Sequence, residues 1–242
     1  MPNEEQFRQY VERLAGDFSF FLHELWISVG LPPPAEHQNQ IAKYLQSGPR
    51  RRGVRAFRDA SKTWVTLAYS LWRLFRDPNE RVMIVSKSEK HSKDSLHMAR
   101  KWIGSVPWLS HLEPDKGKNQ RDSAVQFDVG PSSSDRTPSF SAYGVGGQIT
   151  GARSSVIISD DVETAQNTLT LELRSRLREE IKAEGRKEAE ACIRYATDYR
   201  LGVEDVAANA KEILAALDAA KKDGGGSFAG FKNTAINQWN KE

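Results

Sequence analysis

Two adjacent carboxylates after a short apolar run are the residues of this chain best placed to do chemistry. The run Val156-Ile-Ile-Ser leads straight into Asp160 and Asp161, and Glu163 follows two positions later. A short apolar run predicts a buried parallel strand, and open α/β sheets bind ligands at the carboxyl ends of their strands. Carboxylates are costly to desolvate without a cation or a proton to pair with. The pattern therefore indicates a Walker B strand, which holds Mg²⁺ and polarises water. The alternative is a strand that ends in a solvated acidic turn.

A second reactive segment, Arg55-Ala-Phe-Arg-Asp-Ala-Ser-Lys-Thr63, lies about 100 residues upstream. A short strand is expected at 54–57, and the largely apolar run 64–75 predicts a buried helix. Lys62 and Thr63 fall at the turn between them. A phosphate-binding loop needs a helix N-terminus, a lysine for the phosphates and a hydroxyl for the metal. The segment is thus interpreted as a P-loop formed by residues 58–63.

The usual glycines of such a loop are missing. Asp59 and Ser61 stand where a P-loop prefers glycine, and Asp59 also brings a negative charge toward the phosphates. An ordinary helix N-terminus with a Ser-Lys-Thr cap is the alternative. The downstream acidic strand favours the P-loop interpretation.

Alternating strand and helix signals connect these motifs. Strands are expected at 54–57, 81–86, 124–129, 139–143 and 156–160, and helices at about 63–76 and 88–104. This alternation predicts a parallel sheet covered by helices. Residues 51–168 are therefore expected to form an α/β core of the P-loop NTPase type, a three-layer α/β/α arrangement.

The segments on either side of this core are expected to be helical. Residues 1–50 predict two helices around the break at Pro32-Pro-Pro34, the second near 35–46. Residues 169–242 predict two helices and a tail. The chain has 242 residues and a net charge of +3, and its single cysteine, Cys192, excludes an intrachain disulfide. The chain has neither an apolar run of membrane-spanning length nor a signal-peptide pattern at Met1.

The motifs resemble the large terminase subunit (DNA maturase B) of T7-like tailed phages, an ATPase that packages viral DNA. The resemblance runs from about residue 16 to about residue 163, in conserved order and approximate spacing. The segments that carry it are Gly16-Asp-Phe, Leu25-Trp26, Leu31-Pro-Pro-Pro34 with Gln38, Ala56-Phe-Arg58 with Lys62-Thr63, Val82-Met-Ile-Val-Ser86, Arg121-Asp-Ser, Phe127-Asp-Val-Gly-Pro131, Gly147-Gln-Ile-Thr-Gly-Ala-Arg153 and Ile158-Ser-Asp-Asp-Val-Glu163.

The resemblance implies ATP and Mg²⁺ as ligands and a role for each matching residue. Gln38 would read adenine, with a solvated helix glutamine as the alternative. Arg58 would neutralise charge on the γ-phosphate. Thr63 and Asp160 would hold Mg²⁺ directly or through water. Asp161 or Glu163 would orient the attacking water, and Asp161 is favoured because it directly follows Asp160. The cofactor-binding set is Gln38, Arg58, Asp59, Ala60, Ser61, Lys62 and Thr63.

Basic residues are candidates for DNA or subunit contact. One group, Arg50, Arg51 and Arg52, precedes the first expected core strand. A second group, Lys87, Lys90 and Lys93, follows the second expected strand, and Arg153 matches a family position. Phosphate contacts use lysine and arginine, although a charge run is more often a solvated face. By resemblance, the partners are double-stranded viral DNA, the small terminase subunit, the portal and a homo-oligomeric ring, in the cytoplasm of the bacterial host and without a membrane.

Residues 169–242 depart from the family. Neither its coupling strand after the acidic strand nor the paired acids of its nuclease is found there. The chain is therefore interpreted as a terminase ATPase segment interrupted soon after Asp161, without nuclease activity and with hydrolysis weakened by Asp59, Ser61 and the missing strand. A catalytically defective nucleotide- or DNA-binding module and a structural or regulatory assembly protein remain the alternatives.

Overall fold

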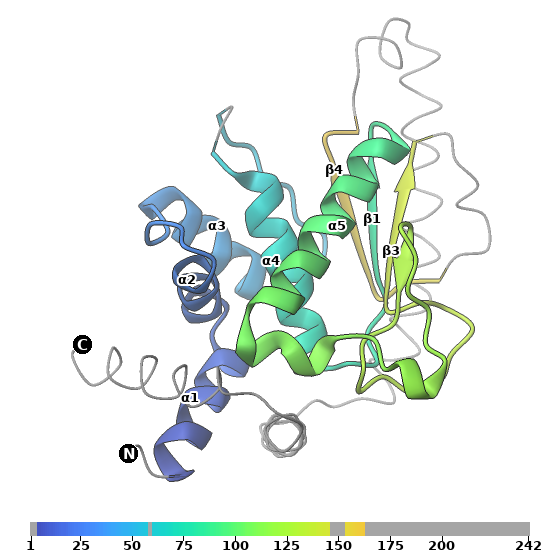
Figure 1. The fold of residues 1–242 in the computed structure, drawn as a ribbon. Coiled ribbons are helices and arrows are strands. Elements are labelled where there is room, and N and C mark those ends of the chain that lie inside the picture. The colour runs from blue at the N-terminus through green and yellow to red at the C-terminus, as the bar shows by residue number, and fades with distance from the viewer. Residues whose placement is uncertain (1–3, 58–59, 146–152, 163–242) are drawn as a thin grey trace, which may run out of the picture. The chain divides into compact units, whose positions relative to one another are not determined.

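The computed structural model describes residues 4–57, 60–145 and 153–162 (Figure 1). The chain divides into two compact units. In the described part, the first contains residues 4–77 and 99–113, and the second contains 78–98 and 114–162. The expected boundaries at residues 50 and 168 stay predictions, and the expected C-terminal helices lie outside the described residues.

The first unit begins with helices α1 (Glu4–Gly16), α2 (Phe18–Ser28) and α3 (Glu36–Ser47). The sequence predicts a single helix before the proline break, and this prediction is wrong. Asp17 interrupts it, because its side chain accepts hydrogen bonds from Ser19 N (2.9 Å) and Phe20 N (3.2 Å) and so caps α2. The helix after the prolines is confirmed.

Helix α4 (Lys62–Arg76) is the central helix of the first unit and contacts α1, α2 and α3. Its apolar side chains are largely buried, as its composition predicts. Phe21 packs edge-on against Trp108, with ring centroids 4.9 Å apart, and against Phe75 at 5.6 Å. Trp72 Nε1 donates to Leu14 O at 3.0 Å. These contacts bury the aromatic residues that hold α4 in place.

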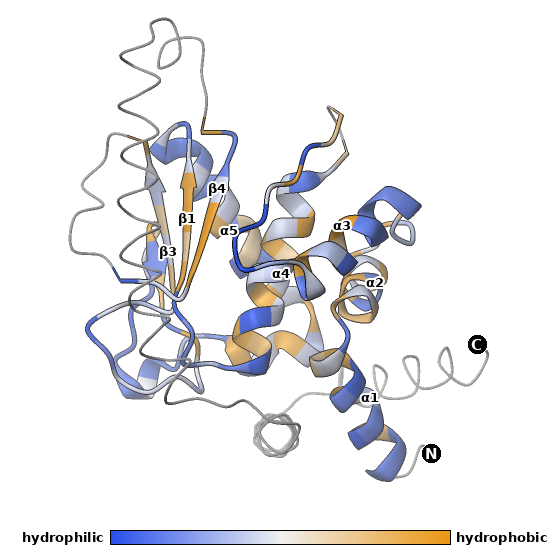
Figure 2. Ribbon diagram, turned by 180° about the vertical axis from the view of Figure 1, so that it is seen from behind, coloured by the Kyte–Doolittle hydropathy of each residue, from blue (hydrophilic) through white to orange (hydrophobic). Residues whose placement is uncertain are grey.

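The second unit is built on a four-stranded sheet in the order β2-β3-β1-β4. The strands are β1 (Val82–Ser86), β2 (Gln126–Phe127), β3 (Phe140–Gly144) and β4 (Val156–Asp160). Strand β1 pairs in parallel with both β3 and β4, and every residue of β1 is buried. Figure 2 shows β1 and β4 as strongly apolar strands, which agrees with their prediction from apolar runs.

Two expected strands differ from the structure. Strand β2 is shorter than expected and runs antiparallel to β3, so the sheet is mixed and not wholly parallel. Asp128 lies in the segment where the longer strand was expected. Its side-chain Oδ1 accepts hydrogen bonds from Arg121 Nη1 (3.1 Å) and Ser139 N (3.2 Å). The strand expected at 54–57 does not form, because these residues have no strand pairing in the described chain.

Helix α5 (Glu89–Ser105) follows β1, begins in the second unit and ends in the first. The 3₁₀ turns Pro107–Leu112 and Lys116–Lys118 come after it. The first turn of α5 packs tightly against the end of β3, because a Cβ added at Gly144 would stand 2.4 Å from Glu89 N. Gly144 therefore permits a close backbone approach at the carboxyl edge of the sheet.

Candidate functional site

The turn before α4 has the backbone of a phosphate loop in one respect. Ser61 has φ 55, in the left-handed region that favours glycine. It occupies the N-cap position of α4, yet its side chain makes no capping hydrogen bond. The alternative of a serine side-chain cap is therefore wrong. The amides at a helix N-terminus are suited to an anion.

Lys62 is held against this turn by the carbonyl groups of the preceding loop. Its Nζ donates to Ala56 O at 3.1 Å and to Phe57 O at 3.0 Å. Ala60 is fully buried and anchors the turn, whereas Thr63 is exposed. The structure thus brings an ammonium group, a hydroxyl-bearing residue and backbone amides to the N-terminus of one helix.

Gln38 lies in the same unit and is buried, so it is not the solvated glutamine of the alternative interpretation. Its Oε1 accepts a hydrogen bond from Ala35 N at 2.9 Å, which ties it to the start of α3. This bond engages the amide oxygen, so base recognition would depend chiefly on the amide NH₂.

Phe57 is a residue that the sequence reasoning missed, because it was assigned to a strand. Its side chain is 63% exposed, unusually high for a large apolar residue, and its ring lies 5.1 Å from the ring of His37. The signal available in the sequence was an aromatic residue directly before the segment 58–63. An exposed ring can stack on a planar ligand.

The acidic strand places its carboxylates at the carboxyl edge of the sheet in the second unit. Asp160 stands opposite Ser86 in the β1–β4 register. Asp161 directly follows the strand and has φ 51, an uncommon conformation that aspartate tolerates better than most residues. Lys87 Nζ lies 3.3 Å from Asp161 Oδ2. Lys87 was considered as a DNA contact from the sequence, and its ion pair with Asp161 was not anticipated.

The Ser86 hydroxyl is buried and has no hydrogen-bond partner among the described residues. Paired residues of parallel strands present their side chains to the same face of the sheet, so Ser86 and Asp160 share a face. The sequence predicts a strand at 81–86 and a family resemblance at Val82–Ser86, but it does not single out Ser86 as a site residue.

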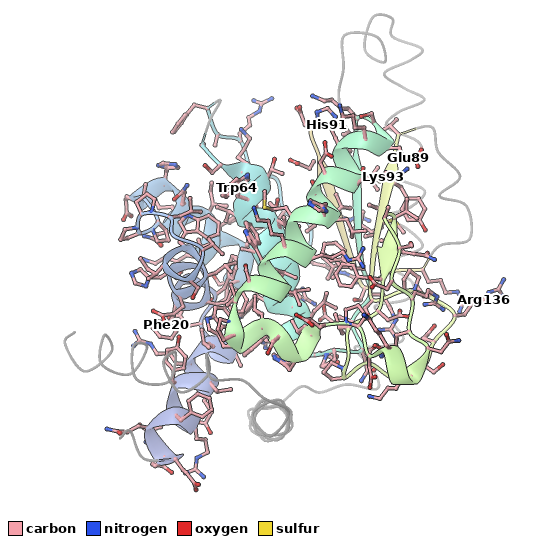
Figure 3. The ribbon with its side chains drawn as sticks, in the orientation of Figure 1. Phe20, Trp64, Glu89, His91, Lys93 and Arg136 are labelled. Carbon is pink, nitrogen blue, oxygen red and sulfur yellow. The ribbon has the colours of Figure 1, made fainter. Side chains whose placement is uncertain are left out.

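The basic candidates differ in their surroundings. Arg52 is used internally: its guanidinium donates to Tyr69 Oη (2.9 Å) and Gly48 O (3.0 Å). Arg50, Arg51 and Arg153 are exposed. Lys93 pairs with Glu89 at 2.7 Å on the first turns of α5 (Figure 3). The internal bonds make Arg52 less suited to DNA contact than its exposed neighbours.

Three candidate residues, Arg58, Asp59 and Glu163, lie outside the described residues. Within the described ranges, no group of three or more metal-ligating side chains is present. A Mg²⁺ ion that arrives with phosphates needs only one or two protein carboxylates and keeps several waters. The carboxylate of Asp160 is an oxygen donor of this kind by its chemistry.

No protein-family model matches the chain. Residues of the chain are 39% identical over 168 positions to the large terminase subunit of Enterobacteria phage T3. The aligned stretch covers 69% of this chain, and it spans 28% of the relative's length. In the described part, no helix is both long and apolar enough to cross a membrane. The chain is therefore similar to a segment of a phage terminase large subunit, as its sequence motifs indicate.

Proposed function

We propose that this chain binds ATP with Mg²⁺ and hydrolyses it as an ATPase segment of the phage DNA-packaging type. The observation that carries the proposal is the start of α4, where Ser61 takes a glycine-like conformation and its side chain makes no capping hydrogen bond. Lys62 adds a positive charge at the same turn. The similarity to a terminase large subunit supports the same interpretation.

In this proposal, the first unit binds the nucleotide. The amides of α4 and Lys62 take the phosphates, and Thr63 offers its hydroxyl to the metal. Lys62 would exchange its two carbonyl partners, Ala56 O and Phe57 O, for phosphate oxygens. Phosphate oxygens are better partners because the resulting hydrogen bonds join two charged groups. By the resemblance, Arg58, Asp59 and Ala60 would complete the phosphate loop, and Arg58 would neutralise charge on the γ-phosphate.

The base would bind beside the start of α3. Gln38 contributes its amide NH₂, because its carbonyl oxygen already accepts from Ala35 N. The exposed ring of Phe57, which lies against His37, provides an apolar face for stacking. Adenine would thus be held by one polar and one aromatic contact.

By the resemblance, the hydrolytic carboxylates are Asp160, Asp161 and Glu163. Mg²⁺ bound with ATP would supply charge neutralisation on the phosphates. Asp160 would hold this ion through a carboxylate oxygen, directly or through water. Asp161 would accept a hydrogen bond from the attacking water and orient it, and Glu163 is the second candidate for this role.

The partners proposed from the resemblance are double-stranded viral DNA, a small terminase subunit, a portal and further copies of the chain in a ring. Arg51 and Arg153 are exposed and suited to phosphate contact. Direct binding of duplex DNA is expected to weaken with rising salt, because such contacts release counterions.

Two measurements separate the proposal from its alternatives. ATP is titrated with and without Mg²⁺, and phosphate release is then followed. Metal-dependent binding with phosphate release supports the ATPase. Binding without release indicates a catalytically defective nucleotide-binding module. An absence of nucleotide binding would refute the proposal and favour a structural or regulatory assembly protein.

A further inference from the structure

The two ends of the Gln38 amide have different surroundings at the start of α3. The residue is only 9% exposed. Its Oε1 accepts a hydrogen bond from Ala35 N at 2.9 Å, and Ala35 is the N-cap residue of the helix. Only the oxygen of an amide can accept from a backbone N–H, so this bond also determines which end of the amide is which. The carbonyl end of Gln38 is therefore part of the helix cap.

The NH₂ end of Gln38 is left for a ligand. Among the described residues, the oxygen of this amide has a hydrogen-bond partner and the nitrogen has none. Polar groups of buried side chains nearly always have a partner in the protein, in water or in a ligand. The NH₂ group can donate and cannot accept, so a ligand that binds it must present an acceptor.

A short series of contacts connects Gln38 to the turn before α4, within the first unit. Lys62 Nζ donates to Phe57 O at 3.0 Å. The ring of Phe57 lies 5.1 Å from the ring of His37, which directly precedes Gln38. Helices α3 and α4 also contact each other. The exposed ring of Phe57 and the amide of Gln38 thus lie at the same end of α3, beside the residue that would take the phosphates.

Adenine and guanine differ in what they present to an amide. In adenine, the N7 acceptor lies beside the N6 amino donor, whereas in guanine N7 lies beside the O6 acceptor. An amide that uses both of its ends distinguishes the two bases, because its carbonyl accepts from N6 and is repelled by O6. An amide with only its NH₂ group available donates to N7 of either base.

We propose that the nucleotide site of this chain selects purines but discriminates weakly between adenine and guanine, because the Gln38 oxygen is engaged by Ala35 N. This inference rests on the proposed function, since it concerns the base of the nucleotide bound at the start of α4. The ring of Phe57 favours purines, because their larger ring system stacks over more of its surface. The Gln38 NH₂ group donates to N7, and the 6-amino group of ATP is not read by this amide.

A series of nucleotides tests the wild-type chain. Binding of ATP, GTP and purine riboside triphosphate, which lacks the 6-amino group, is measured by calorimetry with Mg²⁺. The three affinities should agree within about threefold, because the three bases share N7. The analogue 7-deaza-ATP replaces N7 by carbon and should bind about two- to tenfold more weakly than ATP, because it loses one hydrogen bond. Binding of ATP about tenfold or more tightly than GTP would overturn the proposal.

Ala35→Pro releases the oxygen of Gln38. Proline has no backbone N–H, and the φ of −67° at Ala35 already suits its ring. The released oxygen can accept from adenine N6, so this variant should bind ATP about five- to a hundredfold more tightly than GTP. Ala35→Gly keeps the N–H and is the matched control, which should retain the wild-type ratio. An unchanged ratio in Ala35→Pro, or an equal rise in Ala35→Gly, would contradict the role of the cap.

The nucleotide series also separates a failure of this inference from a failure of the proposed function. If Lys62→Ala weakens ATP binding and wild type rejects GTP, the nucleotide site stands and the inference falls. If no nucleotide binds, or if Lys62→Ala leaves every affinity unchanged, the proposed function itself fails. If Ala35→Pro does not fold, which far-ultraviolet circular dichroism detects, the wild-type series decides: similar affinities for ATP and GTP support the inference, and a strong preference for ATP overturns it.

Discussion

The buried His111 should make the first unit sensitive to mild acid. Burial lowers the pKa of His111 to about 4, and a backbone contact with Trp108 opposes only part of this shift. Neither ring nitrogen has a hydrogen-bond partner of good geometry among the described residues. The ring packs against Phe75 at 5.3 Å, in the aromatic core beneath α4. A proton on this ring would place an uncompensated charge in an apolar core.

The sign and size of the effect follow from linkage. In the unfolded chain the histidine pKa is about 6.5, so the unfolded state takes up the proton first as pH falls. The stabilisation is fully present above about pH 6.5 and is lost progressively toward pH 4. The complete loss amounts to about 3 kcal/mol, and about 2 kcal/mol of it falls between pH 7 and pH 5.

Urea unfolding at pH 7 and pH 5, followed by tryptophan fluorescence, measures this loss. The five described tryptophans all lie in the first unit and report on it: Trp26, Trp64, Trp72, Trp102 and Trp108. His111→Leu keeps a side chain of similar size without a titrating group. The pH dependence of its unfolding free energy should be about 2 kcal/mol smaller than that of wild type. An identical pH dependence in both proteins would refute the argument.

Two further perturbations test the packing of each unit by urea unfolding. Gly144→Ala should destabilise the second unit by about 1–3 kcal/mol, because the new Cβ would stand 2.4 Å from Glu89 N; Gly53→Ala, in open space, is the control. Tyr10→Phe should lower the unfolding free energy of the first unit by about 1–2 kcal/mol, because the buried phenol donates to Glu24 Oε2 at 2.6 Å. Burial raises the pKa of Tyr10, so the phenol remains a donor throughout the accessible pH range. No loss in either variant would contradict the assigned contacts.

The elements predicted well from the sequence were those whose own composition determines their burial. The runs that form β1 and α4 are long enough and apolar enough to require a buried position. The run of β4 does form a strand, but only Val156 of it is buried. The absence of a strand at 54–57 was not predictable in the same way, because a strand also needs a pairing partner, which local sequence does not reveal. The split at Asp17 could have been found, since an aspartate before Phe18-Ser-Phe is a capping signal.

The candidate site was predictable as residue types and not as contacts. The positions of Lys62 and Asp160 follow from motifs at a strand or helix end. The ion pair of Lys87 with Asp161 depends on the register between strands 74 residues apart, which no local pattern specifies. Likewise, the exposure of Phe57 depends on the failure of its segment to join a sheet. Such non-local pairings are determined by the fold as a whole.

The affinity for Mg·ATP of wild type and Lys62→Ala tests the central claim most directly, with Lys101→Ala on the exposed surface of α5 as the charge-matched control. Loss of a charge-assisted lysine–phosphate contact costs about 1.5–3 kcal/mol, so Lys62→Ala should bind Mg·ATP about ten- to a hundredfold more weakly than wild type. Lys101→Ala should bind Mg·ATP with the affinity of wild type. Equal affinities of all three proteins would contradict the assignment of the α4 N-terminus as a phosphate site.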